Sequence, residues 1–229
     1  MTERRFRRIQ QVLDRRQPDL TVLAEDVYKP HNLSAMLRSS DAVGIGTVHA
    51  VRPTGGVPTY NATSGSAQKW VALDVHDTLE AALATVRSQG MQVLAAHFSD
   101  AAVRYDTVDY TQPTCIVFGN EKQGVTPACA AAVDAHVVIP MLGMVSSLNV
   151  SVAAAVILFE AQRQRRRAGL YDTPRLDGVE RNALAVRWLH PRQARWLEER
   201  GLPLPRLRPD GSLPEETVAR LADGATPDR

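Results

Sequence analysis

The sequence predicts an α/β fold in which a mostly parallel sheet is covered by helices on both faces. Short apolar runs alternate with helical patterns from about residue 20 to about residue 165. These runs are continuously apolar, as in strands that are buried on both sides of a parallel sheet. A regular alternation of strand and helix is typical of α/β domains.

The predicted elements follow one another in a simple order. A basic helix over residues 4–16 comes first, and its apolar stripe is Phe6, Ile9 and Leu13. Strands are predicted at residues 20–23, 47–51, 71–75, 91–96, 115–118 and 135–139. Helices are predicted from residue 30 to a stop at residue 44 and over residues 78–89, 126–133 and 148–165.

Length and composition indicate how the chain is divided into domains. With 229 residues and 44% hydrophobic content, the natural prediction is one domain of roughly 150 residues with extensions. We assign residues 1–17 to a basic helix, residues 18–160 to the α/β domain, and residues 161–229 to a helical extension with a loose tail. No apolar run approaches a membrane span, and the N-terminal MTERRFRRIQ is charged, so a cytoplasmic protein without a membrane partner is predicted.

Cysteine and histidine usage gives no metal or disulfide signal. The chain has two cysteines, Cys115 and Cys129, which we interpret as buried thiols in a reducing compartment. Its six histidines are scattered along the sequence and never occur at the short spacings of common metal-binding motifs. The sequence therefore predicts no metal.

Charge is distributed unevenly, although the net charge is only +2. Residues 17–160 carry 13 acidic and 7 basic side chains, whereas residues 1–16 carry 2 and 6, and residues 161–229 carry 10 and 14. Arginine accounts for 24 of the 27 basic residues. The basic terminal segments, on either side of an acidic middle segment, suggest that the two ends of the chain bind a polyanion. A general preference for arginine on solvated surfaces is the alternative, and it explains the clustering less well.

The segment from Ile139 to Arg167 has the features of a binding loop followed by a helix. Gly143, Ser146 and Ser147 are small residues that let a backbone bend around a ligand, and Ser147 or its neighbour is a plausible N-cap. An ordinary strand, turn and helix would also fit. Asn149 favours a functional site, because an amide in an apolar first turn needs a partner.

The spacing of three residues in this last helix indicates which side faces inward. Val152, Val156 and Phe159 recur at helical intervals and predict the buried face. The loop before this helix and the segment FGNEKQG both follow strands, and ligands in parallel sheets bind at the carboxyl ends of strands. No phosphate loop or dinucleotide fingerprint occurs, which argues against an NTPase or a Rossmann dehydrogenase.

Three ordered segments resemble the characteristic motifs of one family. They are NLSAMLR (residues 32–38), FGNEKQG (118–124), and IPMLG (139–143) with SLNVSVA (147–153). They look like motifs 1, 2 and 3 of the SpoU branch of RNA ribose 2′-O-methyltransferases. The flanking RRFRRIQQVLDRRQPDLTV, VDYTQPTCI and FEAQRQRRRAGLY are similar to the TrmH family, which methylates guanosine 18 in the D-loop of tRNA. The similarity covers residues 1 to about 205.

This resemblance implies a SPOUT-type fold with a C-terminal trefoil knot, a homodimer, a tRNA substrate and S-adenosylmethionine as cofactor. By motif position it implies cofactor contacts at Ala96, Gly119, Ile139 and Leu148. The implied catalytic set is Arg38, Asn32, Glu121, Ser147 and Asn149. Asn32 is also a candidate cap for the helix that begins at residue 30, and Glu121 is the expected carboxylate partner of Asn32 or Arg38.

The tRNA-binding residues follow from the basic extensions that the resemblance marks. They are predicted to be Arg4, Arg5, Arg7, Arg8, His31, Arg163, Arg165 and Arg166. The tryptophans of the C-terminal extension, Trp188 and Trp196, are expected to pin its helices onto the core rather than stack on bases.

Three other functions are kept as alternatives. A ribosomal RNA 2′-O-methyltransferase would share all three motifs, since only the flanking segments favour tRNA. A non-catalytic RNA-binding protein would use the same basic arms without binding the cofactor. A small-molecule enzyme of the flavodoxin-like kind would leave the arginine-rich ends without a purpose.

Overall fold

The structure is a computed structural model that describes residues 2–51, 67–120 and 122–224. It divides into two compact units, which we call the sheet unit (Gln17–Asp172) and the helical unit (Met1–Arg16 with Thr173–Arg229). The sheet unit ends at Asp172, whereas the α/β domain was predicted from the sequence to end at residue 160. The boundary lies later because helix α5 (Val150–Arg167) packs on the sheet along most of its length. Within the described part of the chain, no helix is long and apolar enough to cross a membrane.

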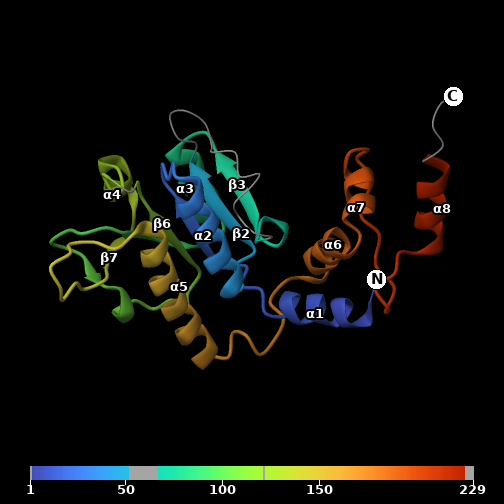
Figure 1. Ribbon diagram of the computed structural model, residues 1–229, viewed down its shortest axis with the longest axis horizontal. Coiled ribbons are helices and arrows are strands. Elements are labelled where there is room, and N and C mark those ends of the chain that lie inside the picture. The colour runs from blue at the N-terminus through green and yellow to red at the C-terminus, as the bar shows by residue number, and fades with distance from the viewer. Residues whose placement is uncertain (1, 52–66, 121, 225–229) are drawn as a thin grey trace. The chain divides into compact units, whose positions relative to one another are not determined.

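The sheet unit is built on a seven-stranded sheet whose strands are all parallel to their neighbours (Figure 1). The strand order is β3-β2-β1-β6-β4-β7-β5. The strands are β1 (Leu20–Ala24), β2 (Thr47–Val51), β3 (Ala72–His76), β4 (Gln92–Ala96), β5 (Val103–Arg104), β6 (Thr114–Phe118) and β7 (Ala135–Val138). The predicted parallel sheet is confirmed. β5 was not predicted, since two exposed residues give no apolar run.

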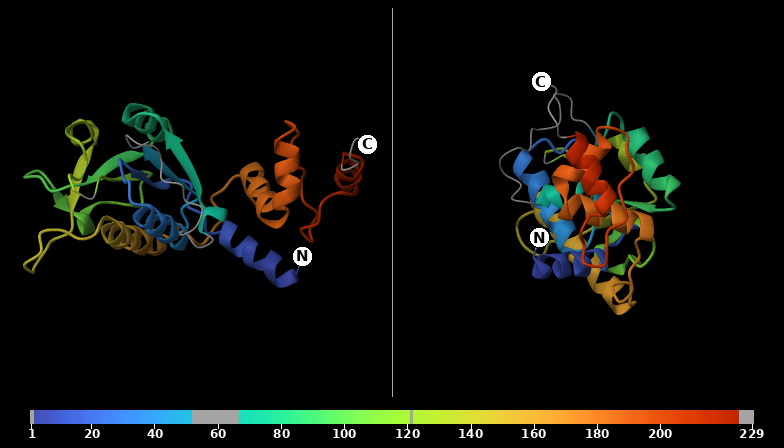
Figure 2. Two further views of the ribbon diagram at one scale, coloured as in Figure 1. Left: turned by 45° about the horizontal axis from the view of Figure 1, so that its top comes forward. Right: turned by 90° about the vertical axis from the view of Figure 1, so that its right-hand side faces the viewer.

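Helices cover both faces of the sheet, as predicted. α2 (Pro30–Ala42) and α5 lie side by side on one face, and α3 (Leu79–Ser88) lies on the other (Figure 2). α4 (Pro127–Ala132) shares the apolar cluster of α3. Short 3₁₀ turns, η1 (Ala67–Lys69) and η2 (Tyr105–Thr107), complete the unit.

The continuously apolar strands are explained by the two helical layers. In β6, Ile116 and Phe118 belong to the cluster beneath α2 and α5, whereas Cys115 and Val117 belong to the cluster beneath α3. Successive side chains of a strand point to opposite faces, so both sets of positions must be apolar when both faces are covered. All five β6 residues are buried.

The inward face of α5 was predicted wrongly. Ala154, Ile157 and Leu158 are buried against the sheet, whereas Val152 and Phe159 remain 48% and 49% exposed. The spacing of Val152 and Phe159 does define an apolar stripe, but helical periodicity cannot say which partner a stripe meets. In a single chain this stripe faces outward.

Arg165 is a fully buried residue of α5 and a correction to the predicted RNA-binding set. Its guanidinium donates to the Asp19 carboxylate at 2.6 Å and to the Gln17 side chain at 3.1 Å. It also donates to the main-chain carbonyls of Tyr110 (2.8 Å), Gln112 (2.9 Å) and Asp19 (3.1 Å). A guanidinium with its donors used in this way ties α5 to the segments before β1 and β6. It is not available to RNA.

Both cysteines are buried thiols, as predicted. Cys115 lies in β6 and Cys129 in α4, and both belong to the cluster beneath α3. Burial raises the pKa of Cys115 far above its usual range and that of Cys129 to about 12. Each side chain therefore remains a protonated, apolar packing group.

The helical unit joins the two ends of the chain. Its helices are α1 (Glu3–Leu13), α6 (Gly178–Leu189), α7 (Pro191–Glu198) and α8 (Glu215–Gly224). Buried Trp188 of α6 holds α1, because the Arg16 guanidinium lies 5.1 Å from its ring centroid and Arg5 donates to its carbonyl at 3.0 Å. Arg181 also pairs with Asp14 at 2.7 Å. Trp188 thus pins α1 within the helical unit, and the predicted pinning of helices onto the core stays a prediction.

The segment predicted as a loose tail is partly ordered. Leu213 is buried with Val186 of α6 and Ala194 of α7, and Leu204 and Leu207 pack against this cluster. The Pro-rich composition suppresses helix but does not prevent extended chain from packing its leucines. α8 follows directly, and residues 225–229 lie outside the described residues.

Arg165→Ala should destabilise the protein by about 3–5 kcal/mol, because it leaves the Asp19 carboxylate without its buried partner. Arg166→Ala is the matched control: the neighbouring residue is exposed, and its removal should change the free energy of unfolding by no more than about 0.5 kcal/mol. Urea unfolding of both variants measures the difference. Equal, small effects would show that the buried hydrogen bonds contribute little to stability.

Candidate functional site

A cavity of about 590 Å³ opens at the carboxyl ends of three neighbouring strands. β6, β4 and β7 are adjacent in the sheet, so the loops that follow them meet at one edge. The volume lies within the range of about 300–1,000 Å³ that is usual for small-molecule sites. Its position agrees with the prediction that a ligand binds at this edge.

All four predicted cofactor positions line this cavity. Ala96 ends β4, Gly119 follows β6, Ile139 follows β7, and Leu148 precedes α5. Ser147 and Asn149, two of the predicted catalytic residues, also line it. Residues from four separate parts of the chain are therefore brought together as the motifs implied, although their binding of a cofactor stays a prediction.

The loop after β6 is a tight, closed turn. Asn120 and Gly124 exchange two main-chain hydrogen bonds, both of 2.9 Å. Gly124 has a φ of +71°, a conformation that favours glycine. A Cβ at Gly119 would lie 2.1–2.2 Å from backbone atoms of Gly124 and Val125, so no larger residue fits there. Glu121 lies outside the described residues, and its predicted role is untested.

Asn120 is a site residue that the sequence reasoning missed. Its side-chain oxygen accepts from the Lys122 amide at 2.8 Å, and its side-chain nitrogen donates to the Asp26 carboxylate at 3.1 Å. The residue therefore shapes the loop from inside and connects it to the end of β1. The signal in the sequence is its position within FGNEKQG, between Gly119 and Glu121.

Asn149 and Asn32 form a direct hydrogen bond beside the cavity. The Asn149 side-chain nitrogen donates to the Asn32 side-chain oxygen at 3.1 Å, and Asn32 is only 1% exposed. Asn149 also caps α5 by accepting from the Ser151 amide at 2.8 Å. The need of Asn149 for a partner was predicted correctly. The predicted cap, Ser147 or its neighbour, falls before the observed cap at Asn149.

Asn32 is not the cap of α2. The N-cap is Lys29, Pro30 occupies the first turn, and Asn32 lies inside the helix with its side chain buried. Proline is favoured in the first turn because it has no amide hydrogen to leave unsatisfied. Asn32 can therefore turn inward and hold the loop before α5.

Arg38 and His31 are exposed residues of α2 and are not among the described residues that line the cavity. Arg38 lies six residues beyond Asn32, a rise of about 9 Å along the helix axis. Their six-residue spacing also makes the two side chains point in different directions, so Asn32 is buried while Arg38 is exposed. In one chain, Arg38 is thus apart from the cavity that its motif partners line.

The remaining predicted RNA-binding arginines are exposed and differ in their surroundings. Arg4, Arg5, Arg7 and Arg8 lie along α1, where Arg7 forms an ion pair with Glu3. Arg163 is held by two hydrogen bonds of 2.7 Å from its guanidinium to Glu160, which lower the pKa of that carboxyl group. Arg166 is exposed near the end of α5.

Comparison with known proteins identifies the protein family. The SpoU rRNA Methylase family matches residues 19–159, and its C-terminal companion domain, described as SpoU, rRNA methylase, C-terminal, matches residues 163–216. The chain belongs to the SpoU rRNA Methylase family. The part matched by the first domain contains every described residue that lines the cavity.

Individual proteins resemble the chain over most of its length. A tRNA (guanosine(18)-2′-O)-methyltransferase of Thermus thermophilus is 58% identical over 188 residues, which are 82% of this chain and 97% of that protein. The crystal structure of A. aeolicus TrmH/SpoU tRNA modifying enzyme has 39% identity and a TM-score of 0.77, covering 82% of this chain and 96% of that one.

A third similar protein was solved with AdoMet bound. The AdoMet-bound rRNA methyltransferase from Sinorhizobium meliloti has 30% identity and a TM-score of 0.56, and the match covers 65% of this chain and 61% of that one. The predicted α/β fold of the SpoU type is thereby confirmed.

Gly119→Ala should destabilise the sheet unit by about 1–3 kcal/mol, because the added methyl group overlaps the backbone of Gly124. Gly143→Ala provides the control: a Cβ there meets nothing within 4 Å, and the change in unfolding free energy should stay within about 0.5 kcal/mol. Thermal unfolding of the two variants measures this. A Gly119→Ala protein as stable as wild type would mean that the loop relaxes freely.

Proposed function

We propose that this SpoU family protein transfers a methyl group from S-adenosylmethionine to the ribose 2′-hydroxyl of guanosine 18 in tRNA. The observation that carries the proposal is the cavity at the ends of β4, β6 and β7, where every cofactor position implied by the motifs lies. The 58% identity to a protein named as a tRNA (guanosine(18)-2′-O)-methyltransferase supports the choice of substrate.

The cavity suits S-adenosylmethionine in size and in the character of its walls. Gly119 lets the β6 loop close tightly, and Ala96, Ile139 and Leu148 offer main-chain groups and apolar surface. Because Ala96 has no polar side chain, any hydrogen bond from it must come from the backbone. When bound, the cofactor supplies a methyl group on a positively charged sulfur. The AdoMet-bound relative from Sinorhizobium meliloti supports this assignment.

The proposed role of Arg38 is to position the ribose and its phosphate. A guanidinium remains protonated at neutral pH, so it stabilises the developing alkoxide rather than removing the proton. A substrate phosphate is the natural proton acceptor. Asn149, with Asn32 behind it, holds the loop before α5 in place, and Ser147 provides a hydroxyl at the cavity wall. We retain Glu121 as a carboxylate that orients these groups.

Contacts to tRNA are proposed to come from the exposed arginines of α1, from those at the end of α5, and from His31. Arg4 and Arg8 are exposed on α1, Arg5 also donates to the Trp188 carbonyl, and Arg7 is paired with Glu3. Arg166 is retained, and Arg163 contributes less because Glu160 neutralises it. Such contacts position an RNA without reading its bases.

A homodimer in the cytoplasm completes the proposal. The outward stripe of α5, with Val152 and Phe159 about half exposed, is apolar surface of the kind that subunit contacts bury. Leu142 and Met144 in the neighbouring loop are fully exposed in the single chain. The trefoil knot that the family resemblance implies stays a prediction.

Ribosomal RNA is the second candidate substrate, favoured by the Sinorhizobium meliloti relative, which is named as an rRNA methyltransferase. Purified protein should be incubated with labelled S-adenosylmethionine and separate tRNA and rRNA pools, and the modified nucleotide should be mapped. Label at guanosine 18 of tRNA supports the proposal. Label in rRNA alone favours the second candidate, and RNA binding without label indicates a non-catalytic RNA-binding protein.

Arg38→Ala should reduce methyl transfer by at least about 100-fold, the scale expected when one group that stabilises developing charge is removed. Cofactor affinity, measured by calorimetry, should remain close to wild type, because Arg38 lies outside the cavity lining. Arg87→Ala, which removes an exposed arginine from α3, should retain nearly full activity. Loss of cofactor binding in Arg38→Ala would contradict the assigned role.

Neutralising Arg4 and Arg8 together should weaken tRNA binding and flatten its dependence on salt. Each phosphate contact contributes roughly 0.7–0.9 to the slope of log affinity against log salt, so the double variant should lose roughly 1–2 from that slope. Filter binding at several salt concentrations measures this. Arg163→Ala should change the slope less, since Glu160 already pairs with that guanidinium. An unchanged slope in the double variant would remove α1 from the binding surface.

A further inference from the structure

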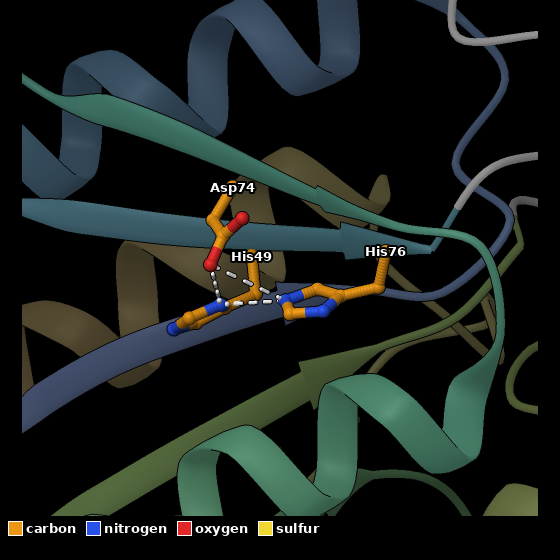
Figure 3. Close-up of side chains that lie close together, drawn as sticks. All are labelled: His49, Asp74 and His76. Carbon is orange, nitrogen blue, oxygen red and sulfur yellow. Dashed lines mark hydrogen bonds and ion pairs between the residues drawn. The ribbon is translucent and has the colours of Figure 1, made fainter.

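Two histidines and one aspartate meet on the edge of the sheet, at a place that no sequence motif marks as a site. His49 lies on β2, and Asp74 and His76 lie on β3 (Figure 3). The parallel register puts His49 beside Asp74. His76 is two residues further along β3, so it projects from the same face as Asp74.

The three ligand atoms converge. His49 Nδ1 and His76 Nε2 are 3.0 Å apart, and Asp74 Oδ2 is 3.5 Å from the first and 3.6 Å from the second. Zinc–nitrogen and zinc–oxygen bonds of about 2.0–2.1 Å in tetrahedral geometry place neighbouring ligand atoms about 3.3 Å from each other. The three separations lie on either side of that spacing, so shifts of a few tenths of an ångström bring the atoms onto one face of a zinc coordination tetrahedron.

The surroundings also suit a metal ion. The imidazoles are shielded, with side-chain exposures of 4% for His49 and 10% for His76, whereas the Asp74 side chain is 52% exposed. The site therefore has a dry, nitrogen-lined interior and a carboxylate on its solvent side. Burial lowers the pKa of His49, and the nearby His76 lowers it further, which favours the neutral imidazole that metals bind.

We propose that His49, Asp74 and His76 form a binding site for Zn²⁺, with a water molecule in the fourth position on the exposed side of Asp74. Two imidazoles and one carboxylate are a common three-ligand zinc set. Mg²⁺ and Ca²⁺ are poor alternatives, since they favour ligand sets made of oxygen. None of the three residues lines the cavity at β4, β6 and β7.

The bound ion would fasten the edge strand of the sheet. β3 is the outermost strand beside β2 and pairs with that strand alone in the described sheet. A metal ion held by His49 from β2 and by both other ligands from β3 adds a cross-strand link to the backbone ladder. Zinc should therefore raise the melting temperature of the protein, because a ligand that binds only the folded state stabilises it.

A hydrogen bond between two neutral imidazoles is the competing account of the same geometry. At 3.0 Å, one ring can donate its N–H to the other, with Asp74 as a neighbour rather than as a ligand. The two accounts differ in what Asp74 does. A zinc site requires its carboxylate as a ligand, whereas the histidine pair does not.

The test is zinc binding by the full-length protein after removal of metals with a chelator. Zinc is titrated in competition with a chromophoric chelator, and Co²⁺ is used in parallel because its visible absorption reports four-coordinate geometry. We expect one tight site per chain. Asp74→Asn and His76→Gln should each weaken binding on the order of 100-fold or more, since even outer-shell partners of metal ligands cost 10–100-fold when lost.

His190→Gln is the matched control, because it removes a histidine from the helical unit and leaves the proposed site intact. It should bind zinc as wild type does. Circular dichroism establishes that each variant is folded, and Asp74→Asn, which changes an exposed side chain, should fold normally. If the chelator retains all the zinc, or if Asp74→Asn and His76→Gln bind it as tightly as wild type, the site does not exist and the histidine pair is a hydrogen bond.

Discussion

The parallel pairing of β6 with both β1 and β4 is the constraint on which the sheet unit depends. Parallel strands need crossover connections, so helices cover both faces, and the central strands are mostly apolar on both sides. The same constraint brings all strand ends to one edge. Loops that are about 20 or more residues apart in the chain, after Ala96, Phe118 and Val138, thus share one cavity.

The sequence predicted what depends on local pattern and on family motifs. Strand ends near Ala96, Gly119 and Ile139 were found because apolar runs and turn residues mark them. Features that depend on tertiary neighbours were missed. The hydrogen bonds of Arg165 join segments that are far apart in the chain. The sequence of an arginine-rich run does not show which of its arginines is buried. The convergence of His49 with His76 follows from strand register.

Arginine plays several separate structural parts in this chain. Arg165 is buried and joins α5 to neighbouring segments through hydrogen bonds. Arg16 lies against the Trp188 ring, and the charge of Arg163 is balanced by the Glu160 carboxylate. Exposed members such as Arg4 and Arg8, by contrast, present their charge to solvent, as the binding of a polyanion needs. A count of arginines in the sequence therefore overestimates the number that can contact a nucleic acid. The burial of each arginine in the structure decides whether it is available.

Because both native cysteines are buried, the folded protein presents no reactive thiol at its surface. Cys115 and Cys129 are inaccessible and remain protonated, so maleimide reagents should not alkylate them in the folded protein. A single cysteine introduced at an exposed position to which no contact has been assigned, such as Arg167, can then carry a fluorophore or a photo-crosslinker without a cysteine-free background. Proximity of that label to a bound RNA or to a second chain becomes directly measurable in the otherwise unaltered protein.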